Sequence, residues 1–276
     1  MNLVAQGPQL GPDEVFELAR LAGCSSFAEI ASHAFRFSCT HVKPDVAAWC
    51  DERRIDHAWM AEGRRFADLR LVGMDMDSTL ITIECIDELG DLAGKKPEIA
   101  RITEEAMRGE IDYPASLRKR VALLAGLEET ALSRVYEERL RLTSGAERLI
   151  DACKASGVKL LLVSGGFTFF TERIKARLGF DYTISNTLEI RDGRLTGKVL
   201  GDIVDAGAKA RKFAAVTKEL GAEKPQTVAI GDGANDLKMM AEAGLSVAFH
   251  AKPVVRAQAS CALNWSGLDA VVNLFE

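Results

Sequence analysis

Short apolar runs that recur from residue 69 onward are the feature that most constrains the fold of this chain. They occupy residues 69–74, 158–163, 227–230 and 245–249. Each run has the length of a strand, and segments with helical patterns separate them. Runs that are apolar on both faces are typical of a parallel sheet buried between two layers of helices. The chain is therefore predicted to fold as an α/β protein.

Polar motifs follow three of these runs directly. The first run leads into Asp75-Met76-Asp77, the second into Ser164-Gly165-Gly166 and the third into Gly231-Asp232-Gly233. The carboxyl ends of parallel strands share one edge of the sheet, where such folds bind their ligands. We expect the three motifs to converge there.

Asp75 and Asp77 alone would not define a site, because Asp-x-Asp is also common in turns, helix N-caps and Ca²⁺ loops. An EF-hand loop needs a further oxygen ligand and then a glycine where this chain has Thr79 and Leu80, so that alternative is rejected. The motifs at the ends of the second and third runs favour a functional site, because they supply further polar groups that can act together with the two acids.

The acidic residues match the requirements of phosphoryl transfer. Asp75 can attack phosphorus to form an aspartyl-phosphate, while Asp77 can protonate the leaving oxygen and later accept a proton from water. Asp232 offers another oxygen ligand, and Asp236 is near it in the sequence. Carboxylates without histidine or cysteine favour Mg²⁺ as the cofactor.

Ser164 and Lys209 are weaker signals when each is considered separately. The Ser164 hydroxyl and the adjacent glycine amides can bind phosphoryl oxygens, but a serine N-cap followed by a glycine turn fits the same motif. Lys209 alone would be interpreted as a surface lysine.

In chain order, the motifs resemble those of the haloacid dehalogenase superfamily over residues 69–276. The resemblance implies a Rossmann-like parallel sheet. It also implies that Asp75 is the nucleophile, Asp77 the general acid/base, and Ser164 and Lys209 phosphoryl binders. Mg²⁺ would be held by Asp75, by Asp232 and by the backbone carbonyl of Asp77. Asn235 would lie close to the phosphoryl group, with Asp236 in a supporting position.

The long segment between the first two runs suggests an inserted helical cap at about residues 82–145. Within it, Arg120 shares a helical face with Leu117, Val121 and Leu124. Such an arginine either meets an anionic partner or extends to solvent from the edge of the face. Glu84 follows the nucleophile loop, where it can bind substrate or complement a helix N-terminus.

A closer resemblance, to the phosphoserine phosphatase family, rests on segments in the nucleophile loop, the cap and the later motifs. These segments are residues 75–80, 84, 107–109, 116–127, 204–206 and 231–237. The resemblance implies that Glu84 and Arg120 bind the amino acid part of O-phosphoserine, and that Gly165 belongs to the substrate site. The chain departs from the family at Tyr113, where phenylalanine is frequent.

The sequence thus predicts a Mg²⁺-dependent phosphatase that hydrolyses O-phosphoserine in the last step of L-serine biosynthesis. One alternative keeps the aspartyl-phosphate but transfers the phosphoryl group to homoserine or another alcohol. Another alternative, of a different class, is a non-catalytic sensor that binds amino acids. The acceptor pocket cannot be identified from sequence, so transfer to an alcohol stays open. The sensor is disfavoured, because a pure binding site does not need Asp75 and Asp77 together.

Residues 1–68 are predicted to form a separate small α/β module, similar to a reduced ACT domain. Its expected helices are 13–22 and 44–54, and its expected strands are 34–39 and 55–60. Residues 187–196 alternate around Asp192-Gly193, which predicts a hairpin with a structural role.

Composition narrows the partners and the compartment. The 276 residues carry a net charge of −5 with a pI near 5.6, which argues against a nucleic-acid surface. No segment has the apolar length of a membrane span. The six cysteines are scattered, so we expect reduced thiols in a cytoplasmic protein. A homodimer is one open hypothesis for the assembly.

Overall fold

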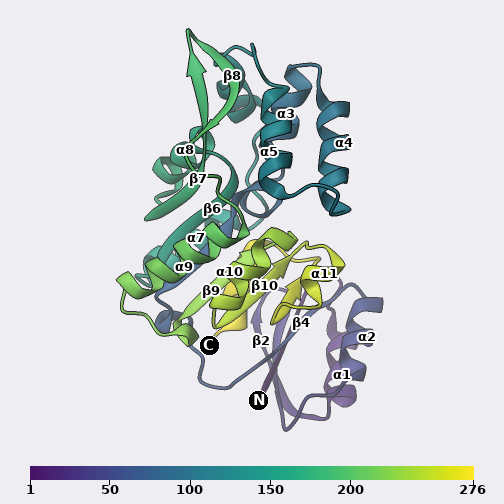
Figure 1. The fold of residues 1–276 in the computed structure, drawn as a ribbon. Coiled ribbons are helices and arrows are strands. Elements are labelled where there is room, and N and C mark those ends of the chain that lie inside the picture. Colours follow the sequence, from purple (N-terminus) through teal and green to yellow (C-terminus); the bar gives the residue numbers. More distant parts are fainter.

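The computed structural model describes residues 1–276 and contains two separate sheets (Figure 1). The larger one has the strand order β11-β10-β9-β5-β6-β7-β8. All its neighbouring strands are parallel except β7 and β8. The four apolar runs form its β5, β6, β9 and β10, which confirms the predicted parallel α/β fold. The strands are β5 (Leu71–Asp75), β6 (Lys159–Phe167), β7 (Tyr182–Arg191), β8 (Arg194–Leu200), β9 (Thr227–Gly231), β10 (Leu245–Phe249) and β11 (Cys261–Leu263).

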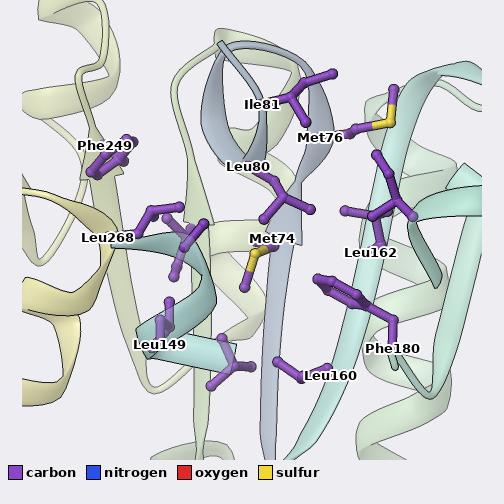
Figure 2. Packing of buried hydrophobic residues seen from close by; sticks show 14 of the residues in the cluster. Met74, Met76, Leu80, Ile81, Leu149, Leu160, Leu162, Phe180, Phe249 and Leu268 are labelled. Carbon is purple, nitrogen blue, oxygen red and sulfur yellow. The ribbon is translucent and has the colours of Figure 1, made fainter. Parts of the chain in front are cut away.

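Helices cover both faces of this sheet. Side chains alternate between the two faces along each strand, so both faces carry apolar groups that must be buried. Val72 and Met74 of β5 pack in the cluster on one face, whereas Leu71 belongs to the cluster on the other. Figure 2 shows Met74 among side chains of the neighbouring strand and of the helical layer. The helices of the first face are α7 (Ala146–Ala155), α8 (Thr168–Leu178) and the 3₁₀ segment η6 (Leu268–Leu274). Those of the second face are α9 (Ala206–Glu219), α10 (Leu237–Glu242) and α11 (Pro253–Arg256).

A group of helices between β5 and β6 corresponds to the predicted cap. Figure 1 shows them gathered beyond one end of the larger sheet, beside the β7–β8 hairpin. Gly109 and Gly126 lie in loops of this group and have φ angles of 76° and 85°, which favour glycine. No helix in the structure combines the length and apolar character needed to cross a membrane. The cap elements are α3 (Cys85–Leu92), α4 (Lys96–Met107), α5 (Tyr113–Ala122), α6 (Thr130–Arg134) and the π-helical turn η3 (Val135–Arg139).

The β7–β8 hairpin turns at Asp192-Gly193, as the sequence predicts, with φ angles of 49° and 71°. It also contacts the cap. Leu195 of β8 donates a backbone hydrogen bond to Leu127 and accepts one from Gly126, at 2.9 and 2.8 Å. The hairpin therefore supports the cap from the side of the sheet.

The smaller sheet belongs to residues 1–68 and has the order β2-β3-β1-β4, with every pair antiparallel. The two predicted helices and the two predicted strands are present. The outer strand β2 and the first strand β1 were not predicted; β2 is largely exposed on both faces and lacks an apolar run. The elements are β1 (Asn2–Gln6), α1 (Pro12–Ala22), β2 (Cys24–Ala31), β3 (Ala34–Cys39), α2 (Asp45–Glu52) and β4 (Asp56–Met60).

The cysteines require a correction. Cys24 and Cys39 form a disulfide, whereas reduced thiols were expected throughout. The two residues are register partners on the antiparallel strands β2 and β3, with their Cα atoms 4.1 Å apart. The two cysteines are 15 residues apart, so their pairing follows only from the register of the β2–β3 hairpin. The other four cysteines are free and buried.

Candidate active site

The three polar motifs meet at the carboxyl ends of β5, β6 and β9, as expected from the parallel sheet. They form the floor of a cavity of about 100 Å³, and the cap supplies its roof. Seven of the site residues predicted from the sequence line this cavity. They are Asp75, Asp77, Glu84, Arg120, Gly165, Asp232 and Asn235.

Lys209 lies beneath the cavity floor on α9. Its Nζ is 2.9 Å from Asp75 Oδ1 and 2.8 Å from Asp236 Oδ1, and the side chain is 1% exposed. Burial acts to lower the pKa of Lys209, but the charges of Asp236 and Asp75 outweigh it and raise the pKa above its usual value. The ammonium is therefore retained inside the protein, where it offsets two buried carboxylates.

Asp75 ends β5 and is almost completely buried. Its Oδ1 accepts a hydrogen bond from the backbone N–H of Met76 at 2.8 Å. Burial, and then repulsion from Asp236, raise the pKa of Asp75 well above its usual value, while Lys209 opposes the shift. Additional positive charge near Asp75 would stabilise its ionised carboxylate.

Asp77 is held by the core and the cap together. Its Oδ1 accepts from the Cys85 backbone N–H at 2.9 Å, and its Oδ2 accepts from the Ser164 hydroxyl at 3.2 Å. Burial raises the pKa of Asp77, and these hydrogen bonds only partly offset the effect. A fixed carboxyl group with a raised pKa is suited to general acid catalysis.

Asp75 belongs to an acidic cluster with Asp232 and Asp236. Ligand oxygens of Asp75, Asp232 and Asp236 lie within 4.8 Å of one another. Asp236 already accepts from Lys209 and from the Gly233 backbone N–H. Asp232 accepts from a threonine hydroxyl, and burial raises its pKa to about 6. Oxygen donors alone, at this density of charge, fit a divalent cation. The Asp77 carboxylate is outside the cluster.

Glu84 and Arg120 also line the cavity. Glu84 Oε1 accepts from the Ser78 hydroxyl at 2.6 Å. One side of Glu84 is open to solvent, but desolvation by the protein around it, together with Asp77, raises its pKa to about 7. Arg120 Nε is buried and has no hydrogen-bond partner. An arginine that lines a cavity with a free buried donor can bind an anionic ligand group.

Comparisons with known proteins agree with this geometry. The family model of haloacid dehalogenase-like hydrolases matches residues 72–241, which include the three strand-end motifs, the cap and Lys209. The chain belongs to the haloacid dehalogenase-like hydrolases. The recognition made from the ordered motifs, and the fold that it implied, are confirmed.

Several proteins similar to this hydrolase are phosphoserine phosphatases. It is 56% identical over 215 residues to a phosphoserine phosphatase of Polaromonas sp., an alignment that covers 76% of this chain and 91% of that one. A "probable phosphoserine phosphatase" structure from Vibrio cholerae is 37% identical with a TM-score of 0.87, covering 99% of this chain and 86% of the other. A substrate-bound phosphoserine phosphatase structure is 38% identical with a TM-score of 0.69, covering 75% and 99%.

Some residues around the cavity of this hydrolase were not identified as site residues from the sequence. Tyr113 lines the cavity, and its hydroxyl donates to the Gly165 carbonyl at 2.9 Å. Asn186 Nδ2, on β7, donates to the same carbonyl at 2.8 Å. The family resemblance draws attention to Tyr113 without assigning it to the site, and its helical spacing agrees, because it precedes Leu117 and Arg120 by four and seven positions. Asn186 carries no such local signal.

Proposed function

We propose that this hydrolase is a phosphoserine phosphatase that converts O-phosphoserine to serine and phosphate, the last step of L-serine biosynthesis. The observation that carries the proposal is a cavity whose core side and cap side carry different chemistry. Asp75 and Asp232 come from the core, with Lys209 behind Asp75. Glu84 and Arg120 come from the cap side, and Arg120 Nε has no hydrogen-bond partner. The names of the relatives agree with this substrate.

In this proposal, substrate charges match the charges of the cavity. Ser164, Lys209, Asn235 and the Gly165 amide bind the phosphoryl oxygens, and Asp236 holds Lys209 in place. Glu84 binds the substrate ammonium, and Arg120 binds its carboxylate.

The proposed reaction has two steps. An Asp75 carboxylate oxygen forms a bond to phosphorus as the bond from phosphorus to the serine oxygen breaks. Asp77 gives its proton to that leaving oxygen. Water then attacks the aspartyl-phosphate, Asp77 takes the proton from the water, and phosphate leaves with Asp75 restored. The contacts from Cys85 and Ser164 orient Asp77 for both proton transfers.

The proposed cofactor is Mg²⁺, held by Asp75, Asp232 and the backbone carbonyl of Asp77. When bound, it offsets repulsion between the anionic Asp75 and a dianionic phosphate. The all-oxygen donor set of the acidic cluster supports this choice over zinc. A cytoplasmic location and a homodimer stay predictions from the sequence.

Phosphate release from O-phospho-L-serine tests the function directly. Release in Mg²⁺, its loss in EDTA and its return when Mg²⁺ is added back are the expected results. Transfer to homoserine is tested in the same reaction by adding homoserine and measuring phosphohomoserine. Binding of phosphoserine without any phosphate release would instead support the amino-acid sensor.

Asp75→Asn tests the nucleophile. The amide cannot form the acyl phosphate, so turnover and incorporation of labelled phosphate should both fall below detection. Unchanged thermal unfolding serves as the control for folding. Normal turnover in this variant would refute the assignment of Asp75.

A further inference from the structure

Tyr113 is a cap residue that contacts the Ser164–Gly166 segment of the core. It is the first residue of α5, after the N-cap Asp112, whose Oδ1 accepts from the Ala115 backbone N–H at 2.7 Å. Leu117 and Arg120 follow on the same helical face, and all three line the cavity. The placement of Tyr113 and that of Arg120 are therefore linked through one short, rigid helix.

The Tyr113 hydroxyl reaches from this helix to the core. It donates to the Gly165 carbonyl at 2.9 Å, and this is the side-chain hydrogen bond that joins α5 to the Ser164–Gly166 segment. The carbonyl also accepts from Asn186 Nδ2 at 2.8 Å, while Asn186 Oδ1 accepts from the Val204 backbone N–H. The Gly165 carbonyl is thus held in place by core residues as well as by the Tyr113 hydroxyl.

Gly165 leaves room for that hydroxyl. A Cβ at this position would lie 2.3 Å from Tyr113 Oη and 3.2 Å from Cζ. The Gly165 backbone does not have a positive φ, so its conformation is open to other residues. Glycine is therefore needed here because the tyrosine hydroxyl occupies the space of a side chain.

We propose that the Tyr113 hydroxyl is a positioning group that docks α5 on the Ser164–Gly166 segment and thereby sets the place of Arg120 above the phosphoryl site. This inference rests on the proposed function, in which Arg120 binds the substrate carboxylate. Tyr113 acts through Arg120 and performs no chemistry itself. Its side chain is well surrounded, and burial raises the pKa of its hydroxyl to about 12, so the donor proton is retained at neutral pH.

Two substrates separate positioning from general structural support. O-phosphoserine carries the carboxylate that Arg120 binds, whereas O-phosphoethanolamine lacks it. Tyr113→Phe should raise KM for phosphoserine about 2- to 10-fold, the range expected for one hydrogen bond, with a smaller change for phosphoethanolamine. Tyr136→Phe makes the same chemical change at a cap tyrosine outside the cavity. It should leave KM unchanged for both substrates.

Gly165→Ala provides an independent test. The added methyl group should displace the hydroxyl and reduce kcat/KM for phosphoserine by more than Tyr113→Phe does. Combining the two changes should recover part of the loss, because removing the hydroxyl removes the closest contact of the methyl group. Equal effects of Gly165→Ala with tyrosine or phenylalanine at position 113 would overturn the proposal, as would equal effects of Tyr113→Phe on both substrates.

Amide hydrogen exchange gives a readout that does not depend on turnover. Peptides from α5 should exchange faster in Tyr113→Phe than in the wild type or in Tyr136→Phe. Unchanged exchange would contradict docking by the hydroxyl. If the wild type does not hydrolyse phosphoserine but its α5 exchange responds to Tyr113→Phe, the proposed function fails while the contact itself stands.

Discussion

Single residues in the cavity differ in how far the protein satisfies their charges. Lys209 has two carboxylate partners and Asp77 has two hydrogen-bond donors, so both are oriented before any ligand arrives. Arg120 Nε has none, and Glu84 accepts only from Ser78. The residues assigned to chemistry are thus preorganised, whereas those assigned to the amino acid part of the substrate have capacity left for a ligand.

Glu84 should give the enzyme a pH-dependent affinity for its substrate. Because its pKa is raised to about 7, the carboxyl group gains a proton and loses its charge as the pH falls through that value. The kcat/KM for phosphoserine should therefore decline between pH 8 and pH 6, in addition to the change caused by the phosphate group of the substrate. A phosphate ester without an ammonium reports the second effect alone. Glu84→Gln should remove the difference between the two profiles; an identical pair of profiles in the wild type would contradict this role.

Among the elements, β5 and α9 together bring Asp75 and Lys209 into contact. The ring of Phe213 on α9 packs over Gly73 of β5, where an added Cβ would lie 2.7 Å from Cδ2. This close approach carries Lys209, one helical turn before Phe213, to Asp75 at the end of the strand. The position of Lys209 thus depends on a glycine in the middle of a strand.

Gly73→Ala should destabilise the protein by about 1–3 kcal/mol, because the methyl group overpacks the interface with Phe213. Urea unfolding followed by circular dichroism measures the loss. Adding Phe213→Leu should restore part of the stability by relieving that contact. Additive losses from the two substitutions would show that the Phe213 ring does not cause the strain.

Elements with regular patterns could be predicted from the sequence, and contacts between distant elements could not. The strands of the parallel sheet follow from apolar runs, and the hairpin follows from Asp192-Gly193. The exposed strand β2 has no such run, and its disulfide depends on the register with β3. In the site, strand-end motifs marked the acids, but the contact between Tyr113 and Gly165 joins residues 52 positions apart. Such a contact is decided by how the cap packs on the core.

At the scale of the whole molecule, the N-terminal module is joined to the hydrolase core by a buried carboxylate. Asp56 begins β4 and is 1% exposed. Its oxygens accept from the backbone N–H groups of Asn264, Trp265 and Ser266 at 2.6, 3.1 and 2.8 Å. These three residues directly follow β11, the edge strand of the larger sheet. The module is therefore fixed to the end of that sheet which is farthest from the β7–β8 hairpin.

Asp56→Ala should lower the stability of the folded chain by about 1–3 kcal/mol, because buried N–H groups lose their acceptor. Thermal unfolding measures this loss. Asp51→Ala, at an exposed position of the same module, is the matched control and should change little. Similar effects of the two substitutions would mean that Asp56 does not hold the two parts together.

The whole molecule is predicted to act on an amino acid phosphate, and the selectivity of Arg120 tests that claim most directly. The measurement is kcat/KM for O-phosphoserine divided by kcat/KM for O-phosphoethanolamine, in the wild type and in Arg120→Ala. The wild type should strongly prefer phosphoserine, and Arg120→Ala should lose most of that preference, mainly through a higher KM for phosphoserine. Equal losses on both substrates, or no preference in the wild type, would contradict the account.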